Sequence, residues 1–318
     1  MAKFGTVSKC LLLCATLLVG GCDFIMGHVA TYYLEPGPPD VPEGVVVHSD
    51  IEFAERANRT LLLDVYLPEQ SPAEPMPVVL FLFGGGWDAG NRHQMSRFNL
   101  HHYPLQGFAV VTADYRYIYE ATFPAQMQDV QSAIRWVRAN AQEFGFDTQR
   151  IGVIGPSAGG HLAALAGTVN RPGELGYDAA PQQRTDVHAV VDFFGPTDFL
   201  QGDAHRQEGA DPWNASDSSV SRLLGAPIDT IPEKVAAANP ITFIDGSEPP
   251  FLILHGEKDA LVPVHQSEIL HRALQAAGVE SELVIVEGGD HGFGGDFYSD
   301  MPSLRVQAFF KQHLGLQE

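Results

Sequence analysis

The sequence predicts an α/β domain built on a doubly wound, mostly parallel β-sheet. Near-continuous apolar runs of strand length recur along the chain, which is typical of strands buried on both faces. These runs lie at residues 78–83, 108–114, 150–155, 187–194, 250–256 and 281–288. Amphipathic stretches separate several of the runs, which implies right-handed crossovers and places functional groups at the carboxyl ends of the strands.

The amino-terminal segment is predicted to be a targeting signal rather than part of the folded domain. Residues 1–21 combine two lysines with an apolar run at 10–20 that is too short to span a bilayer, which indicates a signal peptide. The sequence Val-Gly-Gly before Cys22 resembles a bacterial lipobox, so we expect lipidation of Cys22. Residues 22–44 would form a proline-rich tether, which predicts an extracytoplasmic lipoprotein on a membrane surface. An ordinary signal peptide with an incidental cysteine is the alternative.

One domain is predicted over residues 45–318. Alternating β-branched residues at 45–53 and 60–67 predict an antiparallel hairpin that begins this domain. Apolar residues at spacings of three and four predict helices over 124–144, 266–277 and 303–314. Residues 198–245 are rich in Asp, Ser, Pro and Gly and break this rhythm, so we expect a small insertion over the strand ends.

Charge and cysteine content exclude several classes of function. The chain carries 39 acidic and 19 basic residues, a net charge of −20, which argues against nucleic acid as a partner. All three cysteines lie within the first 22 residues, so the remaining chain holds neither a disulfide nor a thiolate metal site. We expect no metal and no organic cofactor, and the sequence does not indicate an oligomeric state.

A nucleophile is predicted directly after the run at 150–155. The sequence Gly155-Pro156-Ser157-Ala158-Gly159 is a G-x-S-x-G pattern between a strand and a possible helix, where small residues permit a tight turn. Such a turn exposes the Ser157 hydroxyl and directs the next amide, that of Ala158, toward a developing oxyanion. The alternative is a glycine-rich turn with a capping serine.

A general base and an orienting acid are expected in the order Ser, Asp, His. Asp259 follows the run at 250–256, and His291 follows the run at 281–288, so both would lie at the same edge of the sheet as Ser157. Asp290 and Asp198 are weaker candidates for the acid. The weaker candidates for the base are histidines that fit turn packing or solvation, namely His101, His102, His161 and His255.

Further oxyanion donors are predicted after the run at 78–83. Three glycines there allow the backbone to approach a substrate oxygen with no side chain in the way. Gly84 and Gly85 are the expected donors. A flexible glycine hairpin is the alternative.

These motifs resemble those of the α/β-hydrolase superfamily, in the branch of hormone-sensitive-lipase-like and bacterial feruloyl/acetyl esterase-like carboxylesterases. The resemblance extends from about Val45 to Leu314 and rests on the stretches FGGGWDAG, ADYRY, residues 123–165, HGEKDALVPVHQS and GGDHGF. It implies the α/β-hydrolase fold and the catalytic roles expected for Ser157, Asp259 and His291. One departure is Phe83, where the family usually has a histidine, so any brace that this histidine gives the loop is lost.

The resemblance and the motifs together predict a serine carboxylesterase that hydrolyses short acetyl- or feruloyl-type esters through an acyl-enzyme. The substrate would be a small-molecule or glycan ester, held between residues 88–104 and 198–245. Two alternatives stay open. One is an arylformamidase or peptidase-type amide hydrolase, and the other is an inactive hydrolase fold that serves as a binding protein.

Overall fold

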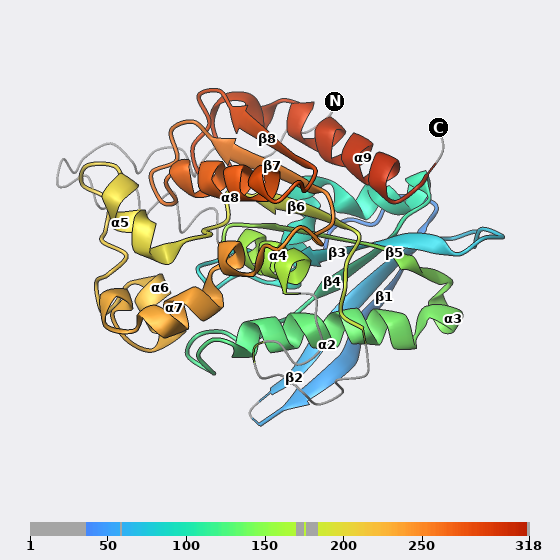
Figure 1. Ribbon diagram of the computed structural model, residues 1–318. Helices are drawn as coiled ribbons and strands as arrows, with labels where there is room; N and C mark the ends of the chain where they lie inside the picture. The colour runs from blue at the N-terminus through green and yellow to red at the C-terminus, as the bar shows by residue number, and fades with distance from the viewer. Residues whose placement is uncertain (1–35, 58, 170–174, 176–183, 317–318) are drawn as a thin grey trace, which may run out of the picture. The chain divides into compact units, whose positions relative to one another are not determined.

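An eight-stranded β-sheet organises the domain, in the order β1-β2-β4-β3-β5-β6-β7-β8 (Figure 1). The strands are β1 (Val45–Arg56), β2 (Arg59–Pro68), β3 (Met76–Leu82), β4 (Ala109–Ala113), β5 (Phe146–Pro156), β6 (Ala189–Phe193), β7 (Phe251–Gly256) and β8 (Ser281–Val286). β2 runs antiparallel to β1 and β4, and the other neighbours are parallel. The predicted leading hairpin and the mostly parallel sheet are therefore confirmed.

The computed structural model describes residues 36–57, 59–169, 175 and 184–316. They belong to one compact unit that starts at Glu35. The predicted signal peptide at 1–21 and the predicted lipidation site Cys22 lie outside the described residues. Within these ranges, none of the helices has both the length and the apolar character needed to cross a bilayer.

Helices cover both faces of the sheet, which explains the uninterrupted apolar runs of the inner strands. Every residue of β3, β4, β6 and β7 is buried. A Cβ on Gly152 of β5 would meet Phe310 of α9 (Met301–His313), whereas a Cβ on Gly167 of α4 (Ala158–Thr168) would meet Val190 of β6. Gly152 and Val190 point to opposite faces, since Val190 is paired with the residue after Gly152. α9 and α4 therefore cover opposite faces.

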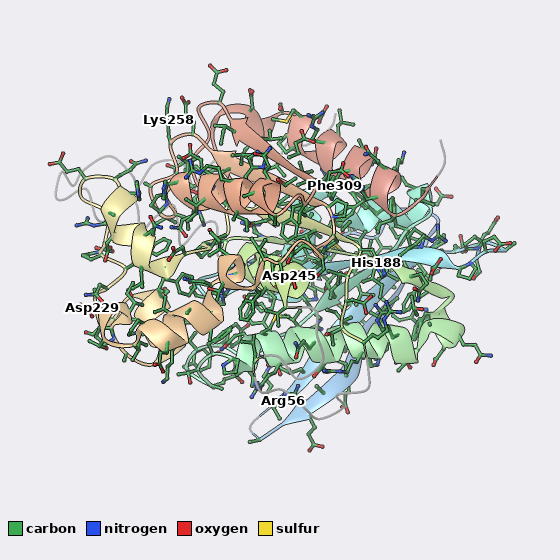
Figure 2. All side chains as sticks on the ribbon, in the orientation of Figure 1. Arg56, His188, Asp229, Asp245, Lys258 and Phe309 are labelled. Carbon is green, nitrogen blue, oxygen red and sulfur yellow. The ribbon has the colours of Figure 1, made fainter. Side chains whose placement is uncertain are left out.

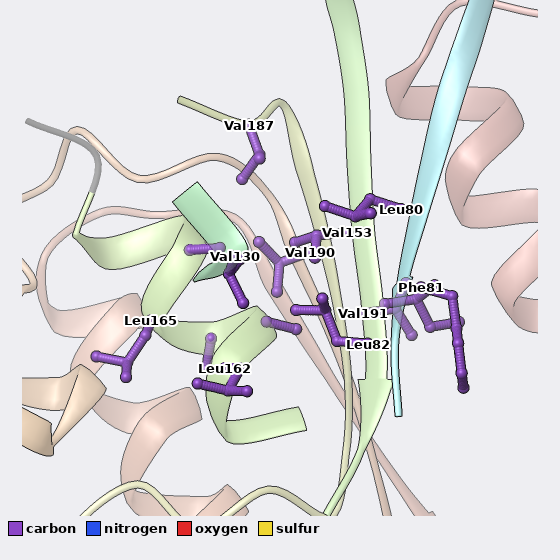
Figure 3. Close-up of a cluster of buried hydrophobic side chains, with 14 of the residues drawn as sticks. Leu80, Phe81, Leu82, Val130, Val153, Leu162, Leu165, Val187, Val190 and Val191 are labelled. Carbon is purple, nitrogen blue, oxygen red and sulfur yellow. The ribbon is translucent and has the colours of Figure 1, made fainter. Parts of the chain in front are cut away.

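The face of the sheet that α4 covers also receives α2 (Ala125–Ala139). Figure 3 shows Val130 of α2 and Leu162 and Leu165 of α4 in the same apolar cluster as Val153 and Val190 of the sheet. The predicted helix over 124–144 is divided, because α3 (Ala141–Phe144) follows α2 after a break at Asn140. The Asn140 side chain donates to the carbonyl of Trp136, and this local bond competes with continued helix. α8 (His265–Ala276) and α9 match the other two predicted helices closely.

Two segments without a periodic pattern fold into short helices. Residues 198–245 contain η4 (Phe199–Gln201), α5 (Gly202–His205), α6 (Ser219–Leu224), η5 (Ile228–Thr230), α7 (Pro232–Ala238) and η6 (Pro240–Phe243). In Figure 1, α5, α6 and α7 gather at the left, where the parallel strands end. The segment at 88–104, one of the two predicted to hold the substrate, contains η1 (Arg92–Phe98) and most of η2 (Leu100–Gln106), with η1 capped by the Asn91 side chain. Short 3₁₀ helices of this kind leave no amphipathic stripe in a sequence.

A buried carboxylate joins the leading hairpin to the sheet and to α2. Asp129 of α2 is fully buried and accepts hydrogen bonds at 2.7 Å from the Nε atoms of Arg56 and Arg116. Arg56 ends β1 and is labelled in Figure 2. Arg116 follows β4, so one carboxylate holds three segments together.

We expect Asp129→Asn to lower the free energy of unfolding by about 3 to 5 kcal/mol, because two partly buried guanidinium groups lose their counter-charge. Urea unfolding followed by circular dichroism measures this loss. The matched control is Glu282→Gln, which removes a carboxylate from an exposed pair with Arg305 and should cost less than about 1 kcal/mol. Equal losses in the two variants would contradict the importance of the buried pair.

Candidate active site

Ser157 occupies the sharp turn between β5 and α4. Its backbone has φ 54° and ψ −118°, a conformation that a non-glycine residue rarely adopts. The Ser157 N–H donates to the carbonyl of Phe193, at the end of the neighbouring strand β6, at 2.7 Å. The side chain thus stands at the carboxyl edge of the sheet, as the G-x-S-x-G pattern predicts.

The two glycines of the pattern are required by close backbone contacts. A Cβ on Gly159 would lie 2.1 Å from the carbonyl oxygen of Leu82, and a Cβ on Gly155 would lie 2.4 Å from the backbone of Gly159. Both distances are far below contact distance, so any side chain would push α4 away from β3 and β5. The turn that holds Ser157 therefore depends on backbone packing.

Asp259 and His291 form a buried pair at the ends of β7 and β8. The Nδ1 atom of His291 lies 2.7 Å from Oδ2 of Asp259, and His291 and Asp259 are 2% and 3% exposed. Oδ1 of Asp259 accepts hydrogen bonds from the N–H groups of Leu261 and Val262. An acceptor-only carboxylate requires the proton of His291 on Nδ1, so Nε2 presents a lone pair.

Asp259 is held in its charged form. Burial by itself would raise its pKa, but the electrostatic interaction with His291 and hydrogen bonds from His255 and His291 outweigh burial and hold the pKa of Asp259 well below its usual range. A permanently ionised carboxylate can orient an imidazole and balance the imidazolium that forms during proton transfer.

β6 connects the serine to this pair. The Ser157 N–H binds the Phe193 carbonyl, and the ring of the next residue, Phe194, lies 4.5 Å from the His291 ring between centroids. The structure therefore brings Ser157 and the Asp259–His291 pair to adjoining ends of β5, β6, β7 and β8.

The other carboxylates and histidines are engaged elsewhere. Oδ1 of Asp290 accepts from the backbone N–H groups of Ala260 and His291, so it does not serve the imidazole ring. Asp198 accepts from Asn239 and Gln201 within the insertion. His161 is fully buried, and burial lowers its pKa to about 4 despite its hydrogen bond to the Ala238 carbonyl. The rings of His101 and His102 contact each other at a tilt of 49°, with His102 exposed.

His255 supports the acid rather than the serine. Its Nε2 lies 2.8 Å from the Val262 carbonyl and 3.2 Å from Oδ2 of Asp259. Since a carbonyl only accepts, Nε2 carries the proton, and Nδ1 accepts from the Ser267 hydroxyl at 2.6 Å. Two histidines thus face Asp259. The sequence predicts only that His255 packs near a turn. It does not predict the contact with Asp259, because no motif spacing indicates it.

The predicted donor Gly84 requires a correction. Its N–H donates to Oε1 of Gln94 at 3.1 Å inside the core, so it is not available to a substrate oxygen. In the described part of the chain, no hydrogen bond uses the N–H groups of Gly85, Gly86 or Ala158. The oxyanion role of Gly85 and Ala158 stays a prediction, and Gly86 replaces Gly84 as the further candidate.

The glycine loop is supported by side chains other than a histidine at position 83. Its ring stacks on Tyr115 with centroids 4.1 Å apart, and its carbonyl accepts from the Tyr115 hydroxyl at 2.8 Å. The Tyr117 hydroxyl donates to the carbonyl of Gly90 at the other end of the loop at 2.7 Å. The brace expected to be lost with the histidine is thus supplied by other side chains.

The insertion contacts both the glycine loop and the acid loop. Arg222 of α6 forms a two-point ion pair with Asp88, with one N–O distance of 2.6 Å. Nε2 of Gln207 donates to the carbonyls of Lys258 and Asp259. The segment at 198–245 is therefore attached to two of the loops that follow the strands.

The aromatic residues near the site are packed into the core. Trp87 and His161 meet edge to face at 5.2 Å, and Phe199 of the insertion contacts both rings. All three are at most 3% exposed. Among the described residues, no group of three or more His, Cys, Asp or Glu side chains could hold a metal ion.

Asp192 is a buried acid behind the nucleophile turn. Its Oδ1 accepts from the N–H of Gly195 and lies 2.3 Å from where a Cβ on Gly160 would be. Its Oδ2 has no hydrogen-bond partner among the described residues. Burial raises its pKa to about 6 despite the Gly195 hydrogen bond and the nearby His255.

We expect Asp192→Asn to change the pH dependence of stability. Because the pKa of Asp192 is higher in the folded state, protonation of Asp192 adds to the free energy of unfolding. This contribution is fully present below about pH 4, the pKa in the unfolded chain, and is lost as the pH rises through about 6. The stability of the variant relative to the parent should therefore increase by about 2 kcal/mol between pH 4.5 and 7.5. Urea unfolding at both pH values measures this, and an unchanged difference would contradict the raised pKa.

Comparison with known proteins places this arrangement in a family. Residues 63–274 match the family model described as BD-FAE. The esterase LipC of Mycobacterium tuberculosis is 34% identical over 236 residues, which cover 73% of this chain and 57% of LipC. The ethyl acetate hydrolase of Pseudomonas putida is 28% identical over 81% of this chain and 78% of its own length. The chain spans about half the length of LipC, LipQ and LipM, the mycobacterial relatives it matches.

Solved structures of esterases have the same fold. A truncated carbohydrate esterase from gut microbiota superposes with a TM-score of 0.75 at 30% identity, covering 88% of this chain and 100% of that one. The butyrate-bound esterase Est2 of Thermogutta terrifontis gives a TM-score of 0.69 at 28% identity, covering 86% and 95%. With its family match over residues 63–274 and these structural neighbours, the chain belongs to the BD-FAE family and has the α/β-hydrolase fold.

Proposed function

We propose that the protein is a serine carboxylesterase in which Ser157, His291 and Asp259 form the catalytic triad. The observation that carries this proposal is the buried His291–Asp259 pair, at 2.7 Å, beside a serine held at φ 54°. A rare backbone conformation next to an oriented imidazole is the arrangement that activates a weak nucleophile. The esterase names of its relatives support the same activity.

The proposed reaction begins with proton transfer from the Ser157 hydroxyl to Nε2 of His291 as the serine oxygen attacks the ester carbonyl. Asp259 keeps the Nδ1–H tautomer of His291 and balances the positive charge of the imidazolium. His291 then gives its proton to the departing alcohol, which leaves an acyl group on Ser157. Water, deprotonated by His291, attacks this acyl-enzyme and releases the acid.

Backbone amides would stabilise the negative oxygen of both tetrahedral intermediates. Ala158 begins α4, so its N–H lies at the positive end of that helix. The N–H groups of Gly85 and Gly86 are the donors proposed on the other side. Gly84, which separates them from β3, touches Pro156, the residue before Ser157: a Cβ on Gly84 would be 2.8 Å from the Pro156 carbonyl oxygen. This contact sets the glycine loop beside the nucleophile turn.

The proposed substrates are short-chain acyl esters, of acetyl or feruloyl type, carried by small molecules or glycans. The structure of Est2 with bound butyrate and the carbohydrate esterase among the structural neighbours support this class. Within this class, the closed packing of Trp87, His161 and Phe199 next to the nucleophile turn favours the acetyl type over the bulkier feruloyl type, because a large acyl group would have to displace buried rings. The predicted signal peptide and Cys22 would place the reaction outside the cytoplasm, on a membrane.

We expect Ser157→Ala to lower kcat for p-nitrophenyl acetate by about 10³- to 10⁶-fold, because the variant has no nucleophile. The parent protein, but not the variant, should be labelled by a fluorophosphonate probe. Asp198→Asn is the matched control for the acid, since the Asp198 carboxylate accepts hydrogen bonds from Asn239 and Gln201 of the insertion, whereas Asp259→Asn should lower kcat by about 10³- to 10⁴-fold. Full turnover by Ser157→Ala would rule out the proposed mechanism.

Specificity for short acyl chains predicts a steep dependence on ester length. We expect kcat/KM to fall by at least about tenfold from p-nitrophenyl acetate or butyrate to the octanoate, since the longer chain has to open the aromatic packing. Release of acetate from acetylated xylan and of ferulate from feruloylated arabinoxylan tests the glycan class. A preference for octanoate would contradict the proposed acyl range, and turnover of N-formylaniline with inert esters would favour an amide hydrolase.

A further inference from the structure

We propose that Gln94 is the positioning residue of the oxyanion site, because its side-chain amide fixes the direction of the Gly85 N–H. This inference rests on the proposed function and adds to it a residue that no motif of the sequence marks. Gln94 lies ten residues beyond Gly84, on η1, and is 1% exposed.

Gln94 holds Gly84 by two hydrogen bonds. Its Oε1 accepts from the Gly84 N–H at 3.1 Å, and its Nε2 donates to the Gly84 carbonyl at 3.3 Å. Both hydrogen bonds are buried, so water does not compete for the N–H or the carbonyl of Gly84. A side-chain amide can make this pairing because it carries a donor and an acceptor side by side.

The bond to the Gly84 carbonyl determines where the Gly85 N–H points. These two groups belong to one peptide unit, which is planar and trans, so they point in opposite directions. When Nε2 of Gln94 binds the carbonyl, the Gly85 N–H is turned away from Gln94 and cannot rotate independently. The glycine at 85, with φ 136°, has no side chain that could restrict this rotation by itself.

The fold reserves space for this side chain. A Cβ on Gly90 would lie 2.7 Å from Nε2 of Gln94, so any larger residue at 90 would displace the amide. η1 is held from its other side, since the neighbouring Arg92 forms ion pairs with the buried carboxylates of Asp64 and Asp114. Gln94 is therefore attached to a fixed support, and the loop is attached to Gln94.

The remaining contacts of the loop do not act on this peptide. Tyr115 binds the carbonyl of Phe83, Tyr117 binds that of Gly90, and the Ile118 N–H donates to the carbonyl of Trp87 at 2.8 Å. These bonds hold the two ends and the far side of the loop. Only Gln94, among the described residues, has a hydrogen bond to the peptide that carries the proposed donor.

The test is Gln94→Met, which keeps the length of the side chain and removes both hydrogen bonds. A misdirected donor weakens the transition state and leaves substrate binding nearly unchanged, so kcat for p-nitrophenyl acetate should fall about 10- to 100-fold with KM within about threefold. The Ki of a trifluoromethyl ketone, which forms an oxyanion on the active serine, should rise by the same factor as kcat/KM falls. Exhaustive fluorophosphonate titration corrects each rate for the fraction of folded sites.

The matched control is Gln131→Met, which replaces a similarly buried glutamine in α2, 3% exposed, that is remote in sequence from the loop. It should keep kcat and Ki within about twofold of the parent values. Gln94→Glu is the second variant: it retains the acceptor for the Gly84 N–H but, as a carboxylate, cannot donate to the Gly84 carbonyl. It should resemble Gln94→Met at about pH 8, well above the usual pKa of Glu, and it carries the test if Gln94→Met does not fold.

The inference would be overturned if kcat per titrated site stays near the parent value in the Gln94 variants. It would also be overturned if only KM changes, so that kcat/KM falls without a fall in kcat. A fall in kcat without a matching rise in Ki would also overturn it, because a structural defect does not select the oxyanion. These outcomes differ from failure of the proposed function, in which the parent protein would not react with the fluorophosphonate or Ser157→Ala would remain active.

Discussion

The backbone strain at Ser157 is the constraint on which the rest of the site depends. A serine at φ 54° is maintained only if the surrounding atoms exclude other backbone conformations. Here the surroundings are backbone atoms: Gly159 lies against Leu82, Gly155 lies against Gly159, and the Ser157 N–H is bound to Phe193. Three adjacent strands thus hold the turn, and the parallel sheet that unites them is the source of the strained conformation.

The same parallel sheet brings together groups that are more than a hundred residues apart. Asp259 and His291 follow β7 and β8 at the carboxyl edge, and the ring of Phe194, which follows β6, packs against the His291 ring. A buried carboxylate would be costly without partners. Here the backbone of Leu261 and Val262 and the rings of His255 and His291 surround Asp259, so its charge is stable where the proposed reaction requires it.

Much of this architecture could be predicted from the sequence, because burial on both faces gives strands a continuous apolar run. The strands from β3 to β7 follow from that pattern, whereas β8, expected to be buried on both faces, lies at the edge of the sheet and is only partly buried. Ser157, Asp259 and His291 are predicted from their places after three of these strands. The short helices at 88–104 and 198–245 could not be predicted, since their turns are stabilised by caps and by tertiary contacts such as the Asp88–Arg222 ion pair. The break at Asn140 depends on one side-chain hydrogen bond, which a periodicity over 124–144 does not record.

In the oxyanion loop, the glycine motif predicts the correct loop but one wrong donor, the N–H of Gly84. Three successive glycines predict that backbone amides face the substrate, but the direction of each amide depends on the partner of the preceding carbonyl. Gln94 binds both polar groups of Gly84, which removes Gly84 as a donor and orients Gly85. What the loop requires is a fixed peptide plane, and in this chain, which has Phe83 before the glycines, the buried amide of Gln94 on η1 provides it.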